Sequence, residues 1–178
     1  MIKEIFSTIY LEKENLLDKK TLEVLYNFVL VNGKKETIVT PKELPELEIL
    51  RKKIHNEAEN LVKSYNFQTL EVSKRFSTHF YSPNEKGEME THSDDLGDYG
   101  RKFISFFYLE AEEEQGGELE LFDPRWLNSC WRDLNSSIKI QPKTNKLIVF
   151  PTFLWHRVNT YYSKNLPRMA LDAVIRIS

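Results

Sequence analysis

The first 66 residues carry hydrophobic positions at helical spacing. Apolar side chains recur every three or four residues from Asp18 to Val31. They recur again after Pro45, where they are Leu47, Leu50, Ile54, Ala58, Leu61, Val62 and Tyr65. This spacing predicts two amphipathic helices. Asp18 is placed to cap the first helix and Gly33 to end it, and proline suits the first position of the second.

After Asn66 the hydrophobic period changes to two, which predicts strands. One face of the first run presents Leu70, Val72, Phe76 and Phe80, and the other presents Arg75, Ser77, His79 and Tyr81. Further strand-like runs follow, with turn-forming stretches between them, at 89–94, 103–109, 118–122, 138–141, 146–150, 155–158 and 169–177. Because no long helix separates these runs, we expect antiparallel sheets and not alternating βαβ units.

About eight strands fit two antiparallel sheets or a closed barrel. We therefore expect a mainly β fold with flanking α structure, a double-stranded β-helix (jelly roll) with the two N-terminal helices packed on one sheet. Residues 1–178 are expected to form a single domain, with 1–66 as helical support and 67–178 as the β core. The irregular segment 123–137 carries Trp126 and Trp131 and is expected to pack as a lid.

The amino-acid composition restricts the classes of molecule that the protein is expected to bind. The chain has 178 residues and balances 25 basic against 27 acidic side chains, so no strong field attracts nucleic acid or anionic lipid. No run of about 18 apolar residues predicts a membrane span. The N-terminal stretch has no signal-peptide core, and one cysteine, Cys130, fits a reducing compartment, so we expect a cytoplasmic protein. Its expected partner is a peptide, protein or small-molecule substrate, and its expected state is a monomer or homodimer.

The candidate chemistry starts from His92 and Asp94, which lie two residues apart in a strand-like run and so share a face. His156, on a later strand, is the best third ligand. Two imidazoles and a carboxylate leave metal positions open, as in non-haem iron(II) oxygenases. On spacing alone, a solvated acidic turn and a core histidine remain open alternatives.

Arg168 follows His156 by twelve residues, across a turn and at the start of the last strand. An adjacent antiparallel strand would bring its guanidinium to the same cavity, where it would suit a dicarboxylate. A surface salt bridge is the alternative. Asp172 shares the face of Arg168 and could orient it or touch substrate, and His79 shares the face of Tyr81.

In this order, the residues resemble the prolyl-hydroxylase-like branch of the iron(II)- and 2-oxoglutarate-dependent oxygenases. The resemblance covers about residues 75–177. It rests on Tyr81 leading into His92 and Asp94, on FISFFYLEA with Tyr108, on GGELELF, on PKTNKLIVF with Asn145 in the family's glycine position, on the motif His156-Arg157-Val158, and on LPRMAL with Arg168.

The resemblance implies that His92, Asp94 and His156 ligate iron(II). It implies that Arg168 binds the distal carboxylate of 2-oxoglutarate, that Tyr108 donates its hydroxyl to that carboxylate, and that Tyr81 lines the pocket. The implied activity is a dioxygenase of the EC 1.14.11 type that uses O2. It would hydroxylate an unactivated C–H bond of a prolyl or other amino-acyl residue while 2-oxoglutarate becomes succinate and CO2, with ascorbate as an accessory reductant. Because halogenases of this family lack the carboxylate, Asp94 favours hydroxylation.

Three alternatives stay open. The same oxygenase could act on a free amino acid or small molecule. A cupin-like protein could hold another metal without oxygenase chemistry. A non-catalytic binding module would not bring His92, Asp94 and His156 together. The gap between His156 and Arg168 is longer than usual for the family, which leaves the register of Arg168 open, although Arg176 lies too far along the strand to replace it.

Overall fold

The computed structural model describes residue 8 and residues 10–32, 37–67, 70–94, 102–123 and 137–177. These contain two helices, α1 (Lys19–Asn32) and α2 (Glu46–Ser64), and eleven strands. The strands are β1 (Leu11–Glu14), β2 (Ile38–Val39), β3 (Leu70–Val72), β4 (Phe76–Tyr81), β5 (Gly87–His92), β6 (Lys102–Glu110), β7 (Leu119–Phe122), β8 (Ser137–Ile140), β9 (Lys146–Pro151), β10 (His156–Tyr161) and β11 (Arg168–Ile177). No helix in the described ranges is long and apolar enough to span a membrane.

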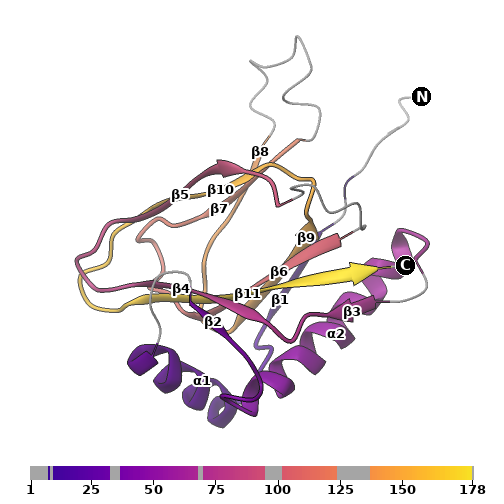
Figure 1. The fold of residues 1–178 in the computed structure, drawn as a ribbon. Coiled ribbons are helices and arrows are strands. Elements are labelled where there is room, and N and C mark those ends of the chain that lie inside the picture. The colour runs from indigo at the N-terminus through magenta and orange to yellow at the C-terminus, as the bar shows by residue number, and fades with distance from the viewer. Residues whose placement is uncertain are drawn as a thin grey trace.

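The strands form two antiparallel sheets. The larger sheet has the order β1-β9-β6-β11-β4-β2, with β3 also paired to β11, and the smaller has the order β5-β10-β7-β8. In Figure 1 the smaller sheet lies over the larger one, and both helices lie beneath the larger sheet. The expected double-stranded β-helix with helices packed on one sheet is therefore confirmed.

The helices cover the larger sheet because each presents one apolar face to it. Leu25 and Val29 of α1 and Leu50 and Ile54 of α2 join a buried cluster with odd-numbered residues of β11, including Leu171. Asp18 caps α1 as predicted, since its carboxylate accepts hydrogen bonds from the backbone N–H and the hydroxyl of Thr21.

A second buried cluster fills the space between the sheets. Side chains of β6, β9 and β10 contribute to it, together with Ala170 of β11. Because side chains alternate along a strand, even-numbered β11 residues face this interior while odd-numbered ones face the helices. Arg168 is even-numbered and lies at the start of β11, so the alternation directs its charged side chain into the barrel.

Two expectations about the elements were wrong in detail. The first 66 residues contain β1 and β2 as well as helices, and both strands join the larger sheet. The division of the chain at residue 66 therefore cuts through one sheet, and the single domain stays a prediction. The run 70–81 is two strands, β3 and β4, separated where Ser73 donates its backbone N–H to the Val174 carbonyl. Gly33, Trp126 and Trp131 lie outside the described residues.

Candidate active site

Strand pairing brings the three predicted metal ligands together at one end of the barrel. β10 pairs with β5 so that His156 lies opposite His92, and Asp94 follows two residues after His92. The backbone N–H of Asp94 donates to the Thr152 carbonyl, which holds this segment against the turn before β10. The ligand atoms of the three side chains all lie within 4.8 Å of one another. A binding module in which they stay apart is therefore excluded.

Both imidazoles are oriented by backbone carbonyls. His92 Nδ1 lies 2.7 Å from the Glu90 carbonyl oxygen, and His156 Nδ1 lies 3.0 Å from that of Leu154. A carbonyl only accepts, so each Nδ1 carries a proton, and in a neutral ring the Nε2 atom then presents its lone pair. Those Nε2 atoms lie 3.7 and 3.6 Å from the two oxygens of Asp94. Two neutral imidazoles and one carboxylate form a donor set that suits a divalent transition metal.

The three side chains differ in exposure, which leaves the cluster open on one side. The side chain of His156 is 6% exposed, whereas those of His92 and Asp94 are 37% and 31% exposed. Burial lowers the pKa of His156, against the opposing effects of the Leu154 carbonyl and the Asp94 charge. A lowered pKa keeps this imidazole neutral, as metal binding requires.

Arg168 lies in the interior, where four aromatic rings surround its guanidinium. Tyr81, Phe106, Tyr108 and Tyr161 have ring centroids 5.3 to 6.0 Å from its central carbon. The residue is 1% exposed, yet its Nε has no hydrogen-bond partner among the described residues, and Nη2 donates only a long bond, 3.5 Å, to the Gly117 carbonyl. No carboxylate among the described residues pairs with it, and because a buried cation without a counterion is costly, this guanidinium indicates an anion site. A surface salt bridge is excluded.

Tyr108 presents a second unused polar atom beside Arg168. It is completely buried, and within the described structure its hydroxyl has no hydrogen-bond partner. Burial raises the pKa of Tyr108, with the Arg168 charge acting in the opposite direction. The phenol therefore keeps its proton and remains a donor. The guanidinium carbon lies 5.3 Å from the centroid of the Tyr108 ring, so the two side chains place two hydrogen-bond donors in the same region of the interior.

Tyr81 also faces the interior, but its hydroxyl is engaged. It lies opposite Arg168 in the pairing of β4 with β11, and its hydroxyl donates a 3.4 Å bond to the Glu88 carbonyl. Its ring packs over Gly87, where any added Cβ would lie 2.7 Å from the ring. Its ring therefore lies beside Arg168 in the interior, and its role as a wall of the 2-oxoglutarate pocket stays a prediction.

Sequence reasoning assigned no role to Gly117, although it had noted the Gly-Gly pair. Gly117 has φ of +74°, and a Cβ there would lie 3.2 Å from Arg168 Nε. Glycine at this position therefore leaves the room that the guanidinium occupies. A pair of glycines directly before a predicted strand indicates a backbone with positive φ, and this is the sequence signal that would have pointed to Gly117.

His79 and Asp172 lie in the interior and contact each other. His79 Nε2 is 2.6 Å from Asp172 Oδ2. No hydrogen bond or ion pair joins Asp172 to Arg168 in the described structure, so Asp172 does not orient Arg168 by direct contact.

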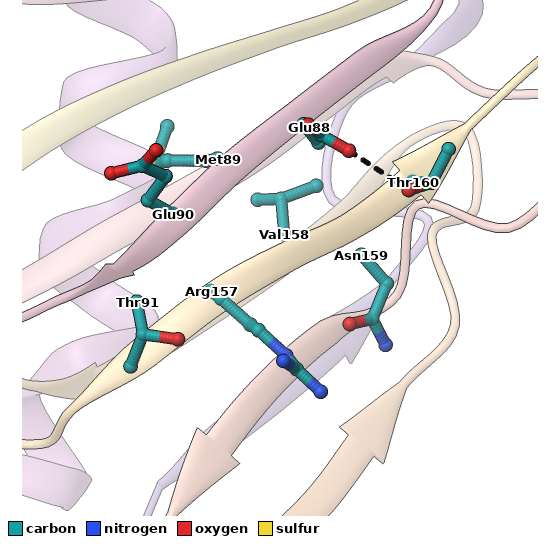
Figure 2. Close-up of a pocket in the computed structure, with 8 residues that line it drawn as sticks. All are labelled: Glu88, Met89, Glu90, Thr91, Arg157, Val158, Asn159 and Thr160. Atoms are coloured by element: carbon teal, nitrogen blue, oxygen red, sulfur yellow. Dashed lines mark hydrogen bonds between the residues drawn. The ribbon is translucent and has the colours of Figure 1, made fainter.

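A groove on the outer surface lies apart from this cluster. Two register irregularities part β5 from β10, and a cavity of about 300 Å³ opens between them. Figure 2 shows Glu88 bonded across it to Thr160, with Arg157 and Asn159 on one side of β10. None of the predicted site residues lines this groove.

Comparison with solved structures identifies the same fold in several enzymes. A Pseudomonas putida prolyl-4-hydroxylase shares 14% identity, with a TM-score of 0.69, over 96% of this chain and 86% of its own. A viral collagen prolyl hydroxylase from Paramecium Bursaria Chlorella virus-1 shares 19%, with a TM-score of 0.62, over 100% and 98%. The epimerase SnoN from nogalamycin biosynthesis shares 13%, with a TM-score of 0.72, over 94% and 77%.

The family of the chain is assigned by a family model, because the sequence identities to these solved structures are too low to show it. No curated protein sequence matches the chain. The model described as the 2OG-Fe(II) oxygenase superfamily matches residues 76–176, more than half of the chain, and this span contains every residue of the cluster. Iron(II) and 2-oxoglutarate, for which the family is named, are what a two-histidine, one-carboxylate cluster beside an unpaired buried arginine would accommodate. The chain belongs to the 2OG-Fe(II) oxygenase superfamily.

Proposed function

We propose that the protein is a 2-oxoglutarate-dependent dioxygenase that hydroxylates an unactivated C–H bond of a prolyl or other amino-acyl residue. One observation carries this proposal: the cluster of His92, Asp94 and His156 borders the barrel interior that holds Arg168 Nε and the Tyr108 hydroxyl, two atoms with no hydrogen-bond partner among the described residues. A cupin-like metal protein has no use for a buried guanidinium and phenol without partners, so these two groups favour the oxygenase.

Each side chain has a specific role in this proposal. His92, Asp94 and His156 hold iron(II) on one side and leave its other side free. Arg168 forms a charge-assisted pair with the distal carboxylate of 2-oxoglutarate, and Tyr108 donates its hydroxyl to the same group. Iron(II) with 2-oxoglutarate and O2 supplies the oxidant that converts C–H to C–OH, while the co-substrate leaves as succinate and CO2.

The barrel itself contributes orientation and exclusion of water. Phe106 and Phe150 belong to the buried cluster between the sheets, and Phe150 packs edge-on against the His156 ring at a centroid distance of 4.9 Å. These apolar walls fix the ring of His156 and lower the local dielectric constant, which strengthens the interaction between Arg168 and an anion. The more exposed side, at His92 and Asp94, is where a substrate would enter.

The proposed substrate class is supported by the descriptions of solved structures that share the fold of this chain. The Pseudomonas putida and viral neighbours are described as prolyl hydroxylases, whereas SnoN is described as an epimerase from an antibiotic pathway. A prolyl or other amino-acyl residue is therefore the first substrate class to test. A free amino acid or small molecule is the second, favoured by the contact between His79 and Asp172 described below.

The test is an anaerobic titration followed by visible spectroscopy. Metal-free protein is mixed with iron(II) and 2-oxoglutarate, and the charge-transfer band of a chelated 2-oxo acid is measured. We expect the band in the wild type and its loss in His92→Ala. The matched control is His55→Ala, which removes a half-buried histidine from α2 and should keep the band. Arg168→Met should require at least about tenfold more 2-oxoglutarate, a difference of about 1.4 kcal/mol.

Succinate formation in air then tests turnover. A band that forms in folded wild type and is lost in His92→Ala, with succinate released on addition of a prolyl peptide or amino acid, supports the proposal. Folded protein that binds metal but gives no band overturns it and favours the cupin-like alternative. Halide incorporation in place of hydroxylation would contradict the role given to Asp94.

A further inference from the structure

The pair formed by His79 and Asp172 belongs to neither the metal cluster nor the 2-oxoglutarate contacts. His79 lies on β4 opposite Ala170, and Asp172 lies on β11 opposite Ser77, so the two side chains meet diagonally on the interior face. The His79 ring packs on Phe106 at 5.2 Å. The side chains are 8% and 20% exposed.

Asp172 lies near the metal ligands along the barrel axis. It pairs with Phe106, one interior position from Ile104, and the Phe150 opposite Ile104 packs against the His156 ring. The Tyr161 ring lies over Arg168, so the end of β10 and the start of β11 share one end of the barrel. From there Asp172 is four residues along β11 and His156 is five residues back along β10. At about 3.3 Å per residue both lie roughly 13 to 17 Å from that end, on facing sheets. The Asp172 charge raises the pKa of His156 against the effect of burial, which fits this proximity.

The side chain between Arg168 and Asp172 on this face is Ala170, a small residue that is fully buried. Ala170 belongs to the buried cluster between the sheets, so Asp172 is the next polar side chain after Arg168 along this face. A substrate that reaches the metal from its open side would meet this stretch of β11.

The chemistry of Asp172 points to what that substrate carries. His79 holds Oδ2, and in the described part of the chain we find no hydrogen bond to Oδ1. A half-buried carboxylate with one held and one available oxygen is an acceptor with a fixed direction. A cationic nitrogen is the group that such a carboxylate binds most strongly, through a charge-assisted hydrogen bond.

We propose that Asp172, positioned by His79, recognises a protonated nitrogen on the substrate close to the C–H bond that reacts. This inference rests on the proposed function and narrows its amino-acyl substrates to those with an ammonium or guanidinium near the reacting carbon. Such a group can come from a free amino acid or from a basic side chain in a peptide. An internal prolyl amide carries no such charge.

The experiment measures succinate formation with matched pairs of probes that differ only in that charge. The free amino acid arm compares L-proline with N-acetyl-L-proline. The peptide arm compares a capped Gly-Lys-Gly peptide with its side-chain-acetylated form, and a capped Gly-Pro-Gly peptide represents the neutral prolyl substrate. Each is assayed with wild type, Asp172→Asn and His79→Gln. The control is Glu120→Gln, which removes a buried carboxylate from the opposite, outer face of the smaller sheet.

We expect the cationic probe of at least one arm to have kcat/KM at least about tenfold above its neutral partner in wild type and in Glu120→Gln. Asp172→Asn should reduce that ratio to near one, because asparagine keeps the shape of aspartate and loses its charge. His79→Gln should reduce the ratio partly, because it removes the imidazole that positions the carboxylate. Neutral probes that match the cationic ones, an unchanged ratio in Asp172→Asn, or no turnover of any cationic probe would overturn the inference. The iron–2-oxoglutarate band, measured on the same samples, shows separately whether the proposed function stands.

Discussion

Asn145 and Leu17 exchange two hydrogen bonds through one side chain. The Leu17 N–H donates to Asn145 Oδ1 at 2.9 Å, and Asn145 Nδ2 donates to the Leu17 carbonyl at 2.8 Å. Asn145 has φ of +63° at the turn into β9, and its backbone N–H donates to the Tyr108 carbonyl at 2.8 Å. One residue thus turns the chain before β9 and joins the segment preceding α1 to the larger sheet.

This arrangement predicts an order of stability at position 145. Asn145→Gly keeps the left-handed backbone but removes both side-chain bonds, and should lower the free energy of unfolding by about 1 to 3 kcal/mol. Asn145→Ala should lose about 1 kcal/mol more, because a Cβ disfavours positive φ. Urea unfolding of the two variants and wild type measures this order. An alanine variant as stable as the glycine variant would contradict the role given to the backbone.

Alanine substitutions at the neighbouring residues Gly116 and Gly117 should cause different defects. At Gly117 an added Cβ would meet the Tyr161 ring and Arg168 Nε, so Gly117→Ala should shift the guanidinium and raise the dissociation constant for 2-oxoglutarate about tenfold. Iron(II) affinity should stay within about a factor of two, since the metal ligands lie elsewhere. Calorimetric titration with each component separates the two effects.

Gly116→Ala serves as the comparison for that experiment. Its added Cβ would overlap the Thr160 carbonyl oxygen, a backbone atom that cannot rotate away. We expect a loss of about 2 kcal/mol or more in unfolding free energy and no selective loss of 2-oxoglutarate binding in the protein that remains folded. If Gly117→Ala behaves in the same way, the close approach to Arg168 is not what selects glycine there.

The ion pair of Arg157 with the buried Glu120, on the outer face of the smaller sheet, should make the stability of the protein depend on pH. Glu120 accepts hydrogen bonds from Ser137 and, at 2.7 Å, from Arg157 Nε. Burial of Glu120 opposes the effect, but these bonds lower its pKa below the usual 4.5. A carboxyl with a lowered pKa adds stability above about pH 4.5, and this stability is lost as the pH falls through the folded-state pKa.

Arg157→Met should therefore destabilise the protein at neutral pH, by about 1 kcal/mol after allowance for the exposure of the arginine. The difference from wild type should shrink as the pH falls below about 4.5, because the carboxyl becomes protonated first in the variant and then, at the lower folded-state pKa, in the wild type. Guanidinium unfolding at pH 7 and at pH 4 measures both differences. A difference that does not change with pH would show that the arginine acts through packing alone.

The burial of His156 should give the stability of the metal-free protein a second dependence on pH. Its pKa is lowered from the usual 6.5 by burial, so the folded protein without metal resists protonation that the unfolded chain accepts. Below about pH 6.5 the unfolded state binds the extra proton, and stability falls with decreasing pH until the folded-state pKa is reached. In the presence of a chelator, wild type should lose stability relative to His156→Gln between about pH 6.5 and 5. A constant difference across that window would contradict the burial of a neutral imidazole.

Local geometry explains which parts of the site the sequence could predict. Residues two apart in a strand point the same way, so His92 with Asp94, and His79 with Tyr81, could be placed on shared faces before any fold was known. The same alternation, with helical spacing before residue 66, predicted the sheets and the helices that cover one of them. Asp18 could be identified as a cap because capping involves only its own next few residues.

Cross-strand register decided the rest. Whether His156 faces His92 depends on how β10 pairs with β5 through two irregularities, and whether Arg168 enters the barrel depends on which residue begins β11. A slip of one residue would turn either side chain to the opposite face. Three further features likewise depend on contacts between segments that are distant in the sequence. They are the contact of His79 with Asp172, the space that Gly117 leaves for Arg168, and the pairing of β1 and β2 with the larger sheet. The sequence alone therefore determined which side chains share a strand face, while the tertiary structure decided which faces meet, because pairing between strands depends on loops and on packing of the whole chain.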